Sequence, residues 1–188
     1  SYTIWLILGL GVWFSMSESI LLGSNFITEF KNLIKNQSVR IDLLLISVSL
    51  IGFFQLFVTI TFVIIANFLI EGDINLFYLN LILLFLLQAV LIIGLNFFIS
   101  PFVILYKDLG LILPNILMIV LFLTPIIYPL DVLPDLLQKF TLFNPFYLIV
   151  DLYRQIIFDI SFNFSIICKL IFIDALIFTL GFLFFKKI

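Results

Sequence analysis

Few residues of this sequence could do acid–base, nucleophilic or metal chemistry. Histidine is absent and the single cysteine, Cys168, lies in an apolar run, which excludes disulfides, zinc clusters and histidine-based acid–base catalysis. The ionisable residues deepest in apolar stretches are Glu18 and Asp174, and such residues are candidates for function by default. Because the sequence leaves their separation open, we assign no carboxylate pair and no metal site. Either carboxyl group could instead hydrogen-bond to a neighbouring helix.

A second group of ionisable residues lies between residues 124 and 159, where four prolines interrupt the apolar sequence. The group comprises Asp131, Asp135, Asp151 and Arg154. Such acids could serve a membrane-embedded enzyme that acts on lipid-linked sugars, although the same residues fit a structural hairpin. Asp151 and Arg154 are three residues apart and could pair on one helix face. No G-x-x-x-x-G-K-[ST] loop occurs, so the chain does not cradle ATP by that motif.

The composition indicates a membrane protein. Of the 188 residues 64% are hydrophobic and 11% charged, whereas soluble domains have about 45–50% and about 25%. A net charge of −2 offers no basic patch for nucleic acid. A spanning helix needs about 20 apolar residues, because backbone polar groups find no water in the hydrocarbon. Five stretches meet this length, at residues 3–22, 41–70, 76–105, 111–130 and 164–185.

We therefore predict an all-α, polytopic membrane protein with one permease-like domain over residues 1–188. The uninterrupted Leu, Ile and Phe runs lack the alternation of a transmembrane β-barrel. The stretch at 41–70 is about 45 Å long as a helix, so we expect it to tilt, to bend or to project beyond the hydrocarbon. The many phenylalanines could line a passage by stacking on sugar rings, but most should face lipid or pack between helices.

The distribution of basic residues predicts an orientation with Ser1 outside the cell. This arrangement puts six basic residues inside: Lys31, Lys35, Arg40, Lys107, Lys186 and Lys187. It puts three outside: Lys139, Arg154 and Lys169. An odd number of spans with an external start suggests that one preceding helix is absent.

Three connections could carry mechanism. Residues 23–40 have a helical apolar stripe beside charges, which predicts a short cytoplasmic amphipathic helix that lies in the headgroups or docks a soluble partner. The stripe and its charges comprise Phe26, Glu29, Phe30, Lys31, Leu33, Ile34 and Lys35. A second cytoplasmic connection contains Lys107 and Asp108. Prolines break residues 124–159 into short helices at about 135–141 and 146–158, which we interpret as a re-entrant helical hairpin on the outer side.

Four local motifs, in this order, resemble the membrane subunit of type-2 ATP-binding cassette exporters, specifically the polysaccharide and O-antigen export permeases. The first two are Gly11-Val12-Trp13-Phe14 with Ser17-Glu18-Ser19, and Asn32-Leu33-Ile34-Lys35. The third is Tyr106-Lys107-Asp108-Leu109. The fourth is Thr124-Pro125-Ile126-Ile127-Tyr128-Pro129, followed by Asn144-Pro145 and Arg154. Ser19, Thr124 and Tyr106-Lys107 depart mildly from the family pattern, which weakens a narrow substrate assignment.

The resemblance implies a six-span fold, of which this sequence would lack the N-terminal amphipathic helix and first span. It implies a transport subunit without catalytic residues or a bound cofactor, two copies of which pair with two cytoplasmic subunits that bind ATP and Mg²⁺. The cargo would be a lipid-linked glycan moved outward across the bacterial inner membrane. The residues coupling to the ATPase would be Phe26, Glu29, Phe30, Leu33, Lys35, Lys107 and Asp108. The external hairpin would comprise Pro125, Tyr128, Pro129, Asn144, Pro145 and Arg154.

Three alternatives remain open at this stage. The first is an exporter of drugs or small lipids from the same superfamily, which would differ only in its substrate. The second is a membrane enzyme, which would turn over a lipid-linked sugar without ATP or a partner. The third is a scaffold subunit, whose deletion would leave glycan export unchanged.

Overall fold

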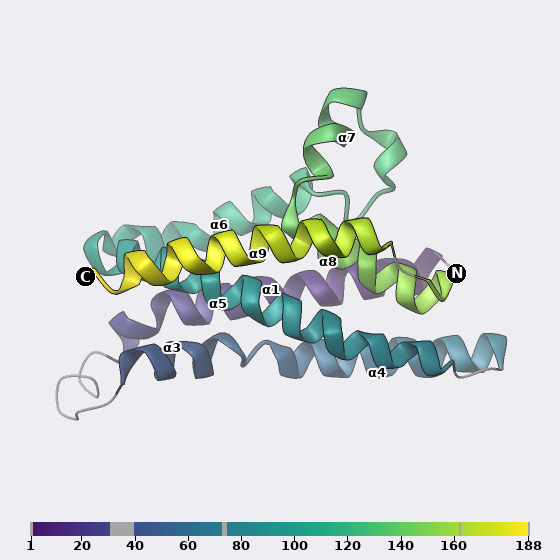
Figure 1. The fold of residues 1–188 in the computed structure, drawn as a ribbon, viewed down its shortest axis with the longest axis horizontal. Coiled ribbons are helices and arrows are strands. Elements are labelled where there is room, and N and C mark those ends of the chain that lie inside the picture. The colour runs from purple at the N-terminus through teal and green to yellow at the C-terminus, as the bar shows by residue number, and fades with distance from the viewer. Residues whose placement is uncertain (1, 31–39, 73–74, 162, 188) are drawn as a thin grey trace.

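The computed structural model describes residues 2–30, 40–72, 75–161 and 163–187. The regular elements of these residues are all helical, and they form one elongated bundle (Figure 1). In chain order they are α1 (Tyr2–Glu29), α3 (Ile41–Ser49), α4 (Phe53–Glu71), η1 (Leu76–Asn80), α5 (Leu81–Leu105), α6 (Lys107–Leu123), η2 (Leu130–Val132), α7 (Asp135–Thr141), α8 (Pro145–Arg154), η3 (Gln155–Asp159) and α9 (Phe164–Phe185).

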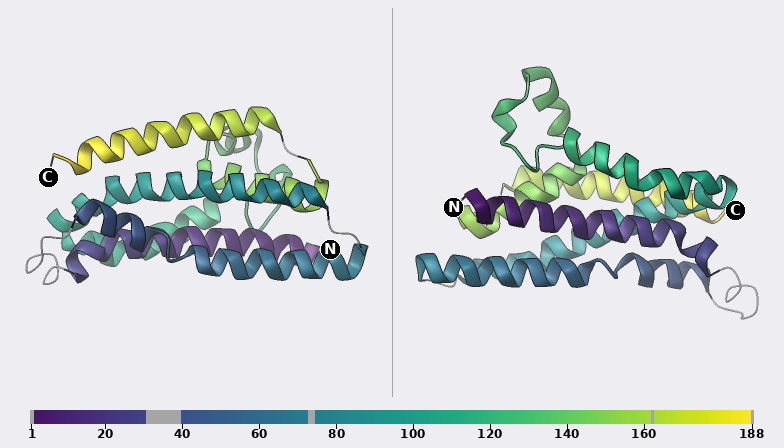
Figure 2. Two further views of the ribbon diagram at one scale, coloured as in Figure 1. Left: turned by 60° about the horizontal axis from the view of Figure 1, so that its bottom comes forward. Right: turned by 180° about the vertical axis from the view of Figure 1, so that it is seen from behind.

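Four helical stretches are long and apolar enough to cross a membrane, which confirms the all-α, multi-pass prediction. They are Tyr2–Glu29, Ile41–Ile70, Leu76–Leu105 and Phe164–Phe185. The N-terminus lies at one end of the bundle and the C-terminus at the other (Figures 1 and 2). We call these the N-end and the C-end. Arg40, Lys107 and Lys186 lie at the C-end, where charge counting predicted the cytoplasm.

The helix expected over residues 111–130 differs from the prediction. It is α6, which begins at Lys107, ends at Leu123 and has 17 residues, or about 25 Å. Thr124 is extended (φ −96°, ψ 128°) because Pro125 disfavours the helical conformation in the residue before it and supplies no N–H to the helix. Apolar composition continues to Leu130, but the helix stops seven residues earlier than the prediction placed it.

The long stretch at 41–70 bends, which is one of the alternatives that its length predicted. It divides into α3 and α4 at a turn over residues 50–52. Gly52 lies directly against α1, since a Cβ built on it would meet the Ser15 carbonyl oxygen at 2.5 Å. The bend therefore brings the backbone of this stretch into contact with α1.

Helix α1 is the centre of the bundle and contacts α3, α4, α5, α6 and α8. It continues through Gly23 to Glu29 as one helix, so residues 23–29 of the predicted amphipathic segment belong to α1, whereas residues 31–39 of that segment lie outside the described residues. The absent side chain at Gly23 leaves room for Asn96 of α5 and Ser49 of α3. Phe26, three residues on, is fully buried with Leu45 and Phe97. These tertiary contacts stabilise the extra turns, which composition alone did not indicate.

Helices α5 and α9 pack against each other most closely at two glycines. A Cβ on Gly94 would lie 2.8 Å from the Phe178 Cα, and a Cβ on Gly181 would meet the Gly94 carbonyl. Beside them the Phe97 ring contacts the rings of α9 at centroid distances of 5.0 to 6.0 Å. Other phenylalanines, such as Phe54 and Phe57 on α4, are exposed on the outside of the bundle. The described aromatics thus pack between helices or face outward, as expected for most of them.

Residues 124–144 leave the bundle sideways near the N-end and carry η2 and α7 (Figures 1 and 2). The return into the bundle is α8, which begins at Pro145 after an Asn144 side chain that accepts a hydrogen bond from the Phe146 N–H. Proline is well suited to this first helical position because its missing N–H has no helical partner there. The two short helices therefore form close to the positions that the prolines predicted.

Candidate functional site

The strap, which we define as residues 124–129, connects α6 to the projecting segment that carries α7. It contains Pro125 and Pro129, so its carbonyl groups cannot all be satisfied by a regular helix. The Thr124 N–H still donates to the Val120 carbonyl and closes α6, and the Ile126 N–H donates to the Thr124 carbonyl at 2.7 Å. The remaining carbonyl groups of the strap are available to side chains from elsewhere in the fold.

Two side chains from other helices donate hydrogen bonds to adjacent strap carbonyls. Arg154 Nη2 of α8 donates to the Ile126 oxygen at 2.7 Å, and the Tyr2 hydroxyl of α1 donates to the Ile127 oxygen at 2.8 Å. Tyr2 and Ile127 are 125 residues apart in the sequence. The strap is thereby attached to both α1 and α8.

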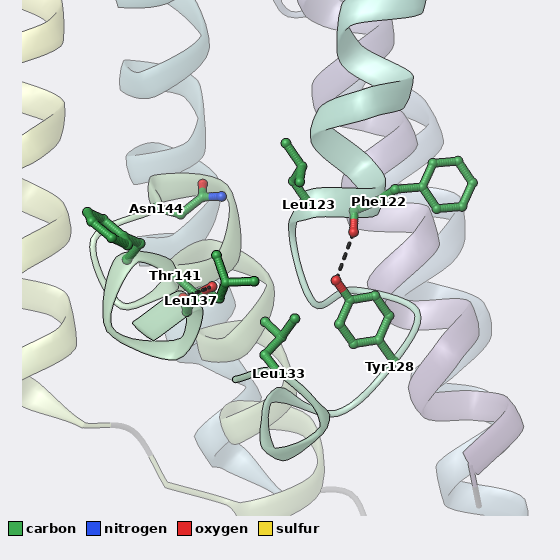
Figure 3. A pocket seen from close by; sticks show the side chains of 8 residues that line it. Phe122, Leu123, Tyr128, Leu133, Leu137, Thr141 and Asn144 are labelled. Atoms are coloured by element: carbon green, nitrogen blue, oxygen red, sulfur yellow. Dashed lines mark hydrogen bonds between the residues drawn. The ribbon is translucent and has the colours of Figure 1, made fainter. Parts of the chain in front are cut away.

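Two further hydrogen bonds hold the strap at its ends. The Tyr128 hydroxyl donates to the Phe122 carbonyl at 2.8 Å (Figure 3), and Asn144 Nδ2 donates to Thr124 Oγ1 at 2.9 Å. Of the residues predicted for the external hairpin, the structure thus brings Tyr128, Asn144 and Arg154 together on one strap. Pro125 and Pro129 lie in the strap itself and Pro145 begins α8.

Arg154 has a buried guanidinium group, with 6% of the residue exposed. Its Cζ lies 3.3 Å from the ring centroid of Trp5 on α1, a cation–π contact. Gly9, one turn further along α1, leaves the space that the guanidinium occupies, since a Cβ there would meet Arg154 Cζ at 3.1 Å. The Nε atom of Arg154 has no hydrogen-bond partner among the described residues. Trp5 and the Ile126 carbonyl are therefore the main partners of this cation.

The ion pair that the three-residue spacing of Asp151 and Arg154 allowed does not form. Among the described residues the one ion pair joins Arg40 and Asp42. The Asp151 carboxylate instead accepts a hydrogen bond from Gln155 Nε2 at 2.7 Å, and Gln155 Oε1 accepts from the Asn163 N–H at 2.9 Å. Three-residue spacing permits a pair on one helix face, but the arginine side chain turns toward α1 and the strap.

Burial determines the protonation behaviour of α8. It lowers the pKa of Arg154 to about 10, although Asp151 and Tyr147 oppose this shift, so the guanidinium remains charged at neutral pH. Burial raises the pKa of Tyr147 to about 12, and the hydroxyl is neutral at neutral pH. Burial also raises the pKa of Asp151, while the hydrogen bond from Gln155 and the charge of Arg154 act in the opposite direction.

Replacing Asp151 with asparagine is expected to raise the thermal unfolding midpoint at pH 7. A carboxyl group with a raised folded-state pKa contributes stability below its unfolded pKa, and this contribution is lost as the pH rises through the folded pKa. The wild-type midpoint, measured in detergent, should therefore fall from pH 4 to pH 7 more than that of Asp151→Asn. Equal slopes for the two proteins would contradict the raised pKa.

A pocket of about 250 Å³ lies between the end of α6 and α7 (Figure 3). Its lining is Phe122, Leu123, Tyr128, Leu133, Leu137, Phe140, Thr141 and Asn144. The Tyr128 and Thr141 hydroxyls and the Asn144 amide already make hydrogen bonds within the chain. The pocket presents no carboxylate and no basic side chain, so what it offers is mainly apolar contact. Within the described part of the chain, no group of three His, Cys, Asp or Glu residues is placed to hold a metal ion.

The two segments predicted to couple to an ATPase lie side by side at the C-end. Gly110 near the start of α6 packs against Asn25 of α1, whose side-chain oxygen would clash with a Cβ at Gly110. Glu29 and Phe30 at the end of α1 are exposed, and so is Asp108 in the first turn of α6. Lys107 is the first residue of α6.

Phe26 differs from the other predicted coupling residues because it is only 1% exposed. Its ring contacts Phe30 at a centroid distance of 6.1 Å. It therefore supports Phe30 from inside the bundle rather than forming part of the accessible surface. The predicted coupling residues Leu33 and Lys35 lie outside the described residues.

The two carboxyl groups predicted within spans have opposite surroundings. Glu18 is exposed on α1, whereas Asp174 is 1% exposed on α9 and neither of its carboxyl oxygens has a hydrogen-bond partner among the described residues. The two groups therefore do not hydrogen-bond to each other.

Sequence reasoning missed two sets of residues. Asn96 lies in α5, where its amide makes hydrogen bonds to α1 and α3, and a lone amide in an apolar span could have indicated this role. Tyr2, Trp5 and Gly9 contact the strap and Arg154 through tertiary structure. Aromatic residues at the start of a span are common at membrane interfaces, so no local pattern distinguished them.

The membrane-length helices define a multi-pass membrane protein in which the strap near the N-end and two adjacent C-end segments are joined through α1. The sequence model of the family described as ABC-2 type transporter matches residues 2–158, and the chain belongs to this family. No curated protein matches the chain. Membership in this family of permeases indicates a transport subunit that pairs with a separate cytoplasmic ATP-binding subunit.

Proposed function

We propose that this chain is the membrane-spanning subunit of an exporter that moves a lipid-linked polysaccharide from the cytoplasm outward across a bacterial inner membrane. Two copies would assemble with two ATPase subunits, which would carry the ATP and Mg²⁺, and a passage would form between the copies. The adjacency of the α1 end and the α6 start is the observation that carries the coupling part of the proposal, since both segments can meet one soluble partner.

The proposed substrate rests on the strap and its neighbours. The sequence of the strap, with Asn144-Pro145 and Arg154, resembles the polysaccharide permeases, and in the structure these residues belong to one hydrogen-bonded unit. This favours glycan export over export of drugs or small lipids. It also favours a structural role for Asp151 and Arg154 over catalysis, because each is engaged within the protein.

Co-purification tests the proposal. The tagged permease, extracted from its native membrane, is expected to bring a soluble ATPase subunit in equal amount, with two copies of each in the particle. An undecaprenyl-diphosphate-linked glycan should then stimulate ATP hydrolysis more than the same lipid without sugar. Stimulation by an amphiphilic drug alone would instead favour the drug-exporter alternative, and purification of the permease without an ATPase would contradict the proposal.

Substituting Phe30 with aspartate is expected to abolish ATPase association while leaving membrane insertion intact. Phe30 is 40% exposed at the end of α1 and rests on the buried Phe26 ring, so it presents a supported apolar surface to a partner. The matched control is Phe68→Asp, because Phe68 is 42% exposed in the last turn of α4, at the opposite end of the bundle from Phe30. Association that survives Phe30→Asp would exclude this part of α1 as the main dock.

A further inference from the structure

Helix α1 reaches from the C-end to the strap without interruption. Its 28 residues contain no proline and span about 42 Å. One end presents Glu29 and Phe30 beside the start of α6, and the other presents Tyr2 beside the strap (Figures 1 and 2). A continuous hydrogen-bonded helix is stiff along its axis, so an axial displacement at one end is expected at the other.

The N-end of α1 offers a three-residue seat for the strap and for Arg154. Tyr2, Trp5 and Gly9 are spaced by three and four residues, so they share one helix face. The Tyr2 and Trp5 rings stack at a centroid distance of 5.7 Å with 21° between their planes. Tyr2 bonds to the strap directly, Trp5 lies against the guanidinium, and Gly9 leaves room for both Arg154 and Ile126.

The contacts of this seat depend strongly on position. A Cβ at Gly9 would also lie 3.3 Å from Ile126 Cγ2, so α1 and the strap are in close contact at this position. Hydrogen bonds weaken steeply with distance and angle, and packed interfaces shift between discrete arrangements rather than stretching. A shift of α1 by a fraction of a turn must either carry the strap along or break its bonds to Tyr2 and Arg154.

We infer that Tyr2, Trp5 and Gly9 are positioning residues through which α1 moves the strap and the α7 segment when the C-end of α1 is displaced. The inference rests on the proposed function, in which the ATPase causes that displacement. In this inference, α1 transmits the change in the nucleotide state of the ATPase directly to the outer hairpin. Arg154 links α1 to the strap, because its guanidinium contacts Trp5 of α1 and donates a hydrogen bond to Ile126 of the strap.

The test measures nucleotide-dependent distances in the permease–ATPase complex in lipid nanodiscs. Spin labels on Leu136→Cys of α7 and Leu69→Cys of α4 report the projecting segment, and both side chains are largely exposed. A second pair, Thr28→Cys of α1 and Leu183→Cys of α9, reports the C-end. The background is Cys168→Ser because Cys168 is exposed and would also be labelled. Distances are compared with ADP and with a non-hydrolysable ATP analogue.

Wild type is expected to change both distances with nucleotide. In Arg154→Met, and in Trp5→Leu, which removes the ring but leaves Arg154 and Ile126 able to bond, the change in the α7 distance should be smaller than in wild type, because only the Tyr2 bond still joins α1 to the strap at full strength, while the change in the C-end distance should be retained. The matched control is Lys169→Met, which removes another cation–π contact, that with Phe143 at 5.8 Å, and should leave both changes intact.

The outcomes separate the inference from the proposed function. An α7 change that persists at full size in Arg154→Met and Trp5→Leu overturns the inference, and so does a wild-type complex in which only the C-end moves. A purified permease without bound ATPase contradicts the proposed function instead, and this is seen before any distance is measured. Because the retained C-end change shows a folded, coupled variant, general misfolding cannot mimic the expected result.

Discussion

Gly94→Val is expected to destabilise the folded protein by about 3 kcal/mol, near the upper end of the usual range for overpacking a core. The Cβ would lie 2.8 Å from the Phe178 Cα and 2.9 Å from its N, and backbone atoms cannot rotate away as a side chain can. Helices α5 and α9 would have to separate, and the Gly181 contact with the Gly94 carbonyl would be lost with the Phe97 ring contacts beside it. Small residues allow this close approach between membrane helices.

Thermal unfolding in detergent, followed by circular dichroism, measures the effect of Gly94→Val. The matched control is Ala175→Val, which places the same valine side chain at an exposed position of α9 and should leave the midpoint nearly unchanged. Gly94→Ala is expected to fall between the two. An unchanged midpoint for Gly94→Val would mean that α5 and α9 are further apart than in the structure.

Replacing Asn96 with leucine is expected to cost about 2 kcal/mol of stability, because the amide makes three hydrogen bonds and each such bond between membrane helices contributes about 0.6 kcal/mol on average, with larger values for some. Asn96 Nδ2 donates to the Ser19 carbonyl at 3.0 Å and to Ser49 Oγ at 2.8 Å. Its Oδ1 accepts from Ser24 Oγ at 3.1 Å. One side chain therefore connects α5 with α1 and α3.

Two single substitutions test whether Asn96 is the centre of this network. Ser24→Ala and Ser49→Ala each remove one of its hydrogen bonds and should each lower the unfolding midpoint by a fraction of the Asn96→Leu effect. Ser47→Ala is the control, since Ser47 is exposed and its hydroxyl bonds to the Leu43 carbonyl of its own helix. If Asn96→Leu cost no more than Ser24→Ala alone, the other two bonds would contribute nothing.

The helical segments followed from local sequence to a large extent. Helix α9 begins at Phe164 and ends at Phe185, and α7 covers Asp135–Thr141, both as predicted. Local physics explains this agreement, because a bilayer requires each span to satisfy its own backbone and prolines interrupt helices wherever they occur. The end of α6 follows the same rule, because Pro125 ends this helix at Leu123 although apolar residues continue to Leu130.

The C-end of α1 required tertiary structure. A change to polar composition at Gly23 suggested a helix boundary, but Phe26 packs on Leu45 and Phe97, which lie 19 and 71 residues further along the chain. Helices in proteins draw most of their stability from such packing. The predicted surface of the coupling segment was therefore only partly accessible, with Phe30 and Glu29 outside and Phe26 inside.

By itself, the sequence determined that this protein is an all-α membrane protein with breaks at its prolines, because apolar length and backbone satisfaction are local properties. Only the tertiary structure decided what Arg154 does. Its neighbour in sequence, Asp151, satisfied the spacing for an ion pair, yet the guanidinium lies between Trp5 and the Ile126 carbonyl. Those partners are 149 and 28 residues away, and a buried cation takes whichever acceptors and rings the packing brings to it.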